Sequence, residues 1–283
     1  MKANNIKYII IILLAVLFLF QISDADEKFR YNFTENDTSN YTIKIDSRIE
    51  FTEHKSLAQL FNIDNITHNI IIKIELITES VMPDKNAKIK AVFRKISAVM
   101  IAGDSVFVDD GSNWGAAKPG SEYVFIITPR GEIVDFFGKD TTAAQQGALT
   151  TKLFFPTYPD DAINEGYNWD DSLSFKFEMQ KNKLTEIQSQ FEYLYNSKGI
   201  GEYDNYYHFS FTIDGLSTDK LISLNGGGEF YTDNANKRII KNSGDFDIDA
   251  FLSLSAFGFP EGIGNDIPVN IQSKIEIELD EDR

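Results

Sequence analysis

The feature that most constrains this chain is an alternation of apolar and polar residues that recurs along most of its length. From Tyr41 to Phe51, apolar side chains alternate with polar ones such as Thr42, Lys44 and Asp46. This is the period of two expected for a half-buried strand. The same pattern returns in the runs 70–76, 91–100, 123–127, 133–137, 173–179, 187–195, 207–213, 229–232, 246–254 and 271–279. The sequence therefore predicts a mainly β fold.

The connections between these runs are mostly short. Pro129-Arg130-Gly131 separates the runs 123–127 and 133–137 and predicts a hairpin with glycine in its turn. Parallel neighbours would need crossovers of about a dozen residues or more. We therefore expect one large antiparallel sheet that forms a half-barrel, a barrel or a sandwich. Only 56–61 and 141–153 have helical spacing, so one or two short helices are expected.

The N-terminus has the pattern of an export signal. Lys2 and Lys7 flank the start of an apolar stretch that ends at Phe20. This stretch is shorter than the about 20 residues of a spanning helix, and Ser23-Asp24-Ala25 fits a cleavage site. We predict a signal peptide over residues 1–25, with an uncleaved N-terminal anchor as the alternative. A periplasmic, outer-membrane-associated or extracellular location is expected, with no transmembrane segment in the mature chain.

The rest of the chain divides into two expected parts. Residues 26–40 are polar and predict a flexible lead-in, because 34–40 lack any periodicity. Residues 41–283 predict a single antiparallel β domain. The longest irregular stretches are 104–120 and 155–169, and the second is a candidate boundary between two halves of the sheet.

Composition excludes several kinds of chemistry. The chain has no cysteine, which excludes thiol catalysis and zinc–thiolate sites. Its formal net charge is −16, and its basic residues are scattered, so a nucleic-acid partner is not expected.

Candidate catalytic and metal sites are incomplete. Gly103-Asp104-Ser105 is similar to the nucleophile block of GDSL-type esterases, but the histidine base of those enzymes has no counterpart after His208. Asp245, Asp247 and Asp249 alternate along one strand, where side chains about 7 Å apart do not surround a calcium ion. The loop with Asp104, Asp109, Asp110 and Gly111 lacks the regular calcium-loop spacing, and His54, His68 and His208 are isolated from one another. Gly226-Gly227-Gly228 precedes a strand and not a helix, which indicates a turn or bulge and not a phosphate loop. We predict no catalytic residue, metal site or cofactor.

Two aromatic triplets are the main candidate for a binding site. Both alternate with polar residues, and a hairpin through 199–205 would place them on one face of the sheet. They consist of Phe191, Tyr193, Tyr195, Tyr207, Phe209 and Phe211. Core packing is the default interpretation. The alternative is the wall of a cavity for an apolar ligand.

One further set of residues is concentrated in the turns between strands. It comprises Thr128-Pro129-Arg130-Gly131-Glu132-Ile133-Val134, Gly138, Phe155-Pro156, Pro159, Gly166, Trp169 and Gly226 to Phe230. This set resembles that of a family of uncharacterised exported bacterial β-rich proteins, many of which carry an N-terminal lipid-anchor cysteine. This chain lacks the cysteine. The resemblance implies export and a large antiparallel sheet, with a broader analogy to the half-barrels of lipoprotein-carrier proteins.

These observations lead to two hypotheses about function. The first is a non-enzymatic envelope or secreted module that binds a protein partner or an apolar small molecule through its sheet. The second is a carboxylate-based hydrolase that the sequence does not reveal, because Asp and Glu total 43 residues and a catalytic pair needs only two of them.

Overall fold

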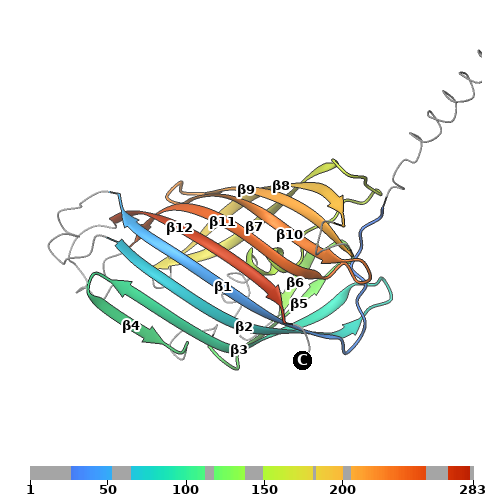
Figure 1. Cartoon of the computed structure of the whole chain (residues 1–283), viewed down its shortest axis with the longest axis horizontal. Coiled ribbons are helices and arrows are strands. Elements are labelled where there is room, and N and C mark those ends of the chain that lie inside the picture. Colours follow the sequence, from blue (N-terminus) through green and yellow to red (C-terminus); the bar gives the residue numbers. More distant parts are fainter. Residues whose placement is uncertain are drawn as a thin grey trace, which may run out of the picture.

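A computed structural model of the chain (Figure 1) describes residues 27–52, 65–111, 118–137, 149–180, 183–199, 205–252 and 267–280. Its strands form one curved antiparallel sheet of 12 strands, with β6 and β7 at the two edges. The predicted antiparallel β fold is therefore confirmed, in the form of an open sheet. The strands are β1 (Thr38–Phe51), β2 (Asn65–Val81), β3 (Ala87–Ala102), β4 (Ser105–Asp109), β5 (Glu122–Ile127), β6 (Ile133–Phe137), β7 (Asn168–Gln180), β8 (Lys183–Lys198), β9 (Tyr206–Ser217), β10 (Ser223–Asp233), β11 (Ile239–Leu252) and β12 (Ile267–Leu279).

The sheet consists of two sets of strands that meet in its middle. The strand order is β6-β5-β3-β2-β1-β12-β11-β10-β9-β8-β7, with β4 paired to β3 beside this path. The strands β1 and β12 therefore pair although they lie at opposite ends of the chain. Their register places Ile43 opposite Ile277 and Ile45 opposite Ile275. Figure 1 shows β1 and β12 next to each other at the centre of the sheet. This long-range pair joins the two halves into one sheet.

Helical structure is sparse in the described part of the chain. The helix expected over 141–153 is described only from residue 149, and residues 149–154 are helical. The expected helix 56–61 lies outside the described residues. No helix among the described residues has the length and apolar character needed to cross a membrane.

The alternation along each strand gives the sheet a buried inner face. Ile43, Phe125, Phe209 and Phe230 lie on it and are 2% exposed or less. Segments that precede β1 and β7 cover part of this face. Phe29 and Tyr158 belong to these segments and are also almost completely buried. The core is thus closed by irregular chain that packs into the curve of the sheet.

The expectation of a flexible lead-in over 26–40 is wrong for its described part. Phe29 and Tyr31 are 1% and 5% exposed. The Tyr31 amide donates to the Pro129 carbonyl at 2.8 Å, and Glu27 forms a β-bridge with Ile163. The physical reason is the apolar series Phe29, Tyr31 and Phe33, whose first two rings are buried and whose third packs against the core while partly buried.

Two further expectations about loops are corrected. The stretch 104–120 was expected to be irregular, yet it contains β4, whose Val106, Phe107 and Val108 are strand-forming residues. Gly226 to Gly228 lie inside β10 and not in a turn or bulge. A Cβ on Gly228 would collide with the Ser243 carbonyl oxygen, and one on Gly226 would come within 2.7 Å of Phe246. Glycine is needed there because β10, β11 and the Phe246 ring pack so closely.

Candidate functional site

The six predicted aromatic residues lie together on the inner face of β8 and β9. The register places Tyr193 opposite Phe211 and Tyr195 opposite Phe209. The structure therefore brings all six to one face, as the alternation indicates. The exposed fractions are 1% for Phe191, 3% for Tyr193, 4% for Tyr195, 0% for Tyr207, 0% for Phe209 and 4% for Phe211.

This aromatic cluster is packed against other rings. Phe29 lies 4.8 Å from Tyr207 and 5.2 Å from Phe209, measured between ring centroids. Trp169 stacks on Tyr193 at 5.3 Å, and its indole N–H donates to the Thr157 carbonyl at 2.7 Å. Such geometry is that of a filled core. A ligand-binding role for these six residues stays a prediction, and the contacts around them are those expected for packing.

A buried ion pair lies beside the aromatic cluster and was not predicted from the sequence. Lys152 of the short helix is 4% exposed, and its ammonium group contacts the Asp171 carboxylate of β7. Burial lowers the pKa of Lys152, and the attraction to Asp171 opposes this effect. Lys152 also donates to the Thr157 hydroxyl. The pair fixes the helix to the edge strand of the sheet. No periodic signal could have linked two residues from different elements.

A second polar cluster holds the start of the described chain. The Lys237 ammonium group lies 2.8 Å from the Glu27 carboxylate and 3.9 Å from the centroid of the Tyr207 ring. Tyr207 donates its hydroxyl to Glu27. Burial raises the pKa of Glu27, but the hydrogen bonds from Lys237 and Tyr207 lower it by more than burial raises it. The pKa of Glu27 is therefore below its ordinary value. This cluster anchors residue 27 against β9 and the end of β10.

The inner face changes character away from the aromatic cluster. Several aliphatic side chains of β1, β12 and β11 on this face pack against the core but are only partly buried. Alternation places Ser47 and Ser273 in the middle of these side chains, where their hydroxyls hydrogen-bond at 2.8 Å. We call this surface the isoleucine wall, and it consists of Ile45, Ile49, Ile248, Ile271 and Ile275. Partial exposure on an inner face means that space of at least water size lies beside these side chains.

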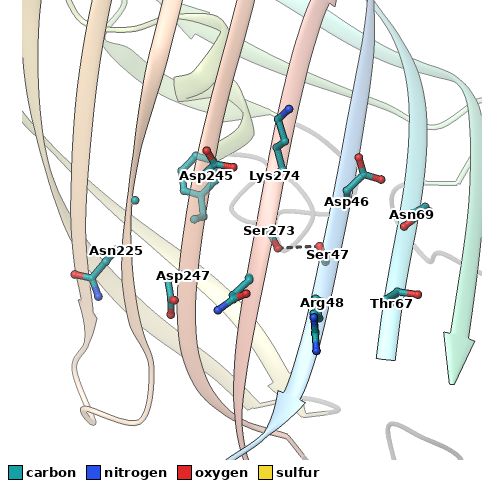
Figure 2. Close-up of a pocket in the computed structure, with 13 residues that line it drawn as sticks. Asp46, Ser47, Arg48, Thr67, Asn69, Asn225, Asp245, Asp247, Ser273 and Lys274 are labelled. Atoms are coloured by element: carbon teal, nitrogen blue, oxygen red, sulfur yellow. Dashed lines mark hydrogen bonds between the residues drawn. The ribbon is translucent and has the colours of Figure 1, made fainter. Parts of the chain in front are cut away.

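The outer face carries a broad polar trough (Figure 2). One depression in it has a volume of about 780 Å³ and crosses β2, β1, β12, β11 and β10. Figure 2 shows that charged and amide side chains of these strands surround it, among them Asp46, Asp245, Asp247 and Lys274. Two neighbouring depressions share Asn225, Asp245 or Lys274 with it, so the trough is continuous. The alternative hypothesis of a carboxylate-based hydrolase stays a prediction.

Asp245, Asp247 and Asp249, which the sequence analysis weighs as a calcium site, lie on this outer face. Asn270 donates its side-chain amide to Asp247 at 2.6 Å and to Asp249 at 3.0 Å. Asp109 accepts from the Gly111 amide at 2.7 Å, which is a local turn interaction. Among the described residues, no group of three or more His, Asp or Glu side chains is arranged to hold a metal ion.

The remaining candidates are dispersed over the molecule. Gly103 and Asp104 form the turn between β3 and β4, and Ser105 begins β4 at the surface. His68 lies on the inner face, where burial lowers its pKa. His208 lies on the outer face, 3.0 Å from Glu229 and stacked on Tyr231. His54 is outside the described residues. The structure therefore does not bring Ser105 together with His68 or His208.

Comparison with known proteins shows the fold alone. No family model matches the chain, and no curated protein sequence matches it. Membership in the family that the turn residues resemble therefore stays a prediction. Among solved structures, lipovitellin superposes with a TM-score of 0.52 at 13% identity, over 88% of this chain. The matched region is 25% of the lipovitellin chain, so this chain spans about a quarter of its length.

Two other solved structures match over more of their own length but superpose less well. The hypothetical lipoprotein YmcC of Escherichia coli has a TM-score of 0.26 at 8% identity, over 81% of this chain and 85% of its own. DynF from the dynemicin pathway of Micromonospora chersina has a TM-score of 0.25 at 6% identity, over 91% and 90%. These values are too low to support a statement about this chain.

Proposed function

We propose that this chain is a non-enzymatic envelope or secreted module that binds an apolar small molecule on the inner face of its sheet. The isoleucine wall carries the proposal. Its side chains face inward yet remain partly exposed, whereas the neighbouring aromatic cluster is completely packed. Concave sites with mainly apolar walls and a few polar groups are typical of small-molecule binding.

The likeness to lipovitellin agrees with this assignment. That structure concerns lipid–protein interactions in lipovitellin, and the likeness covers 88% of this chain. A large curved antiparallel sheet has a long apolar inner face, which suits an extended acyl chain. Ser47 and Ser273 provide hydroxyl groups in the middle of the wall that could meet a polar atom of the ligand. We therefore name a fatty acid or a lipid acyl chain as the ligand class.

The test begins with protein purified from its native host without detergent. Native mass spectrometry should detect a co-purified apolar molecule. A thermal-shift titration with oleic acid should then raise the melting temperature, because the ligand binds only the folded state. At a ligand concentration 100 times the Kd, the expected rise is about 5–10 °C for a chain of this size.

A pair of variants locates the site. Ser273→Phe places a ring between Ile271 and Ile275 and should abolish the thermal shift by filling the space. Ser172→Phe makes the same change at an exposed position on the outer side of β7 and should retain the shift. If no apolar molecule co-purifies and no lipid raises the melting temperature, the proposal is wrong. A shift that survives Ser273→Phe would place the ligand elsewhere.

A further inference from the structure

The outer face of the sheet is polar in its middle but apolar at one corner. This apolar corner lies at the C-terminal end of β3, where β3 pairs with β4 on one side and with β2 on the other. The exposed fraction is 46% for Ile71, 40% for Ile101, 62% for Val106 and 76% for Val108. Val99 lies between them on the same face, paired with Val108 on one side and Asn69 on the other. Adjacent aliphatic side chains of this kind on a surface mark an interaction site.

The hairpin is apolar on its inner side as well. Phe107 is 53% exposed and points to the face opposite to that of Val106 and Val108, because successive strand side chains alternate. A flat protein surface would cover only one face of β4. The interfacial region of a lipid layer would contact both faces at once, and water there still reaches the backbone edge of β4 that no strand pairs with.

Charge argues against a second copy of this chain as the occupant. An antiparallel pair of two β4 strands centred on Phe107 would place Asp104 opposite Asp110 of the other copy. Like charges directly opposite each other destabilise a strand pair. The same carboxylates, with Asp109, would be repelled by an anionic lipid surface. A neutral phospholipid surface suits both the apolar side chains and their acidic flanks.

The position of the corner connects it to the inner face. Ala102 at the end of β3 pairs with Ile66 of β2, and Ile66 pairs with Ile49 of the isoleucine wall. The N-terminal segment lies at the other end of the molecule, where the Asn36 amide donates to the Thr78 carbonyl near the end of β2 and Glu27 contacts Tyr207 at the start of β9. Figure 1 shows β4 and the N-terminal segment at opposite ends of the long axis.

We propose that the apolar corner formed by Ile71, Val99, Ile101, Val106, Phe107 and Val108 docks onto a neutral phospholipid surface. Docking there would bring the isoleucine wall close to the lipid. The docking itself does not depend on ligand binding by that wall, so the two proposals fail separately.

Vesicle flotation tests the docking. Wild-type protein should float with phosphatidylcholine vesicles, and adding phosphatidylglycerol should weaken its binding. The variant Val106→Asp/Val108→Asp should bind about 100-fold more weakly, because each buried valine contributes about a tenfold change in partitioning. Leu216→Asp is the matched control, since Leu216 is a 46% exposed apolar residue on the outer face of β9. It should float like wild type.

A second readout does not depend on the stability of the aspartate variant. Phe107→Trp should show a blue-shifted emission component when phosphatidylcholine vesicles are added. Equal flotation of wild type and the double variant would overturn the proposal, as would flotation with anionic vesicles only. A dimer in sedimentation that the double variant dissociates, without flotation of wild type, would assign the corner to a second copy and also overturn it. Oleic acid binding should be unchanged in the double variant, which separates this test from that of the inner face.

Discussion

The substitution Phe209→Ala tests whether the aromatic cluster is a filled core. Phe209 is 0% exposed, and its ring lies 4.8 Å from Phe230, 5.1 Å from Tyr195 and 5.2 Å from Phe29. Truncating a buried phenylalanine usually costs about 3–5 kcal/mol. Aromatic pairs add about 0.5–1.5 kcal/mol each. The surrounding rings come from the sheet and from two covering segments, so they cannot all collapse into the cavity. We expect a loss near the upper limit, about 4–5 kcal/mol.

Urea unfolding followed by tryptophan fluorescence measures this loss, because Trp169 lies 6.0 Å from the Phe209 ring. With a slope of about 2–3 kcal/mol per M, the midpoint should fall by about 2 M. Phe107→Ala is the control, because Phe107 is 53% exposed, and it should change stability by about 0.5 kcal/mol or less. A cost below about 1.5 kcal/mol for Phe209→Ala would refute the filled core. If the fatty-acid shift was also lost, the aromatic cavity would be the better ligand site.

Two further predictions concern the polar clusters of the interior. Lys152→Met should destabilise the protein by about 3–5 kcal/mol because it leaves the Asp171 carboxylate without its partner, and Lys152→Met/Asp171→Leu should recover most of the loss in the same urea assay. If the double variant was no more stable than the single one, the ion pair would not be the cause. The folded pKa of Glu27 lies below the ordinary value of about 4.3, so its ionised form contributes stability above about pH 4.3 that disappears as pH falls through the folded pKa. The melting temperature of wild type should therefore fall more steeply below about pH 4.3 than that of Glu27→Gln, and parallel curves would contradict this.

Alternation predicted most of the sheet because it reports a local property. The strands around Tyr41, Ile72, Phe125 and Phe209 each have one buried face, and their side chains show it within a few residues. The pairing of β1 with β12 has no comparable signal, since it joins residues such as Ile43 and Ile277 across the whole chain. The sequence therefore allowed strands joined by short turns to be assigned to pairs. It did not show that the two halves of the sheet meet through β1 and β12.

The candidate site was predictable only in part, for a related reason. The six aromatic residues could be assigned to one face, but their cover could not, because Phe29 and Trp169 come from segments outside the β8–β9 hairpin. The buried Lys152 also reads as an ordinary polar residue until Asp171 is placed beside it. Periodicity reports which side of a strand faces inward, and it contains no information about what fills the interior.

The aromatic cluster is fully packed and the isoleucine wall is partly exposed because different chain segments cover these two parts of the inner face. Phe29 and Tyr158 cover β8 and β9, and their rings contact each other and the aromatic cluster. The isoleucine wall has only small polar side chains at its centre, because Ser47 and Ser273 occupy inner positions between larger aliphatic ones. Leu or Ile at both serine positions would fill that space and add apolar burial to the core. Serine at these two positions lacks this apolar burial, which is consistent with the proposed binding of an apolar molecule at the isoleucine wall. Replacing both with valine should therefore stabilise the free protein while it weakens oleic acid binding.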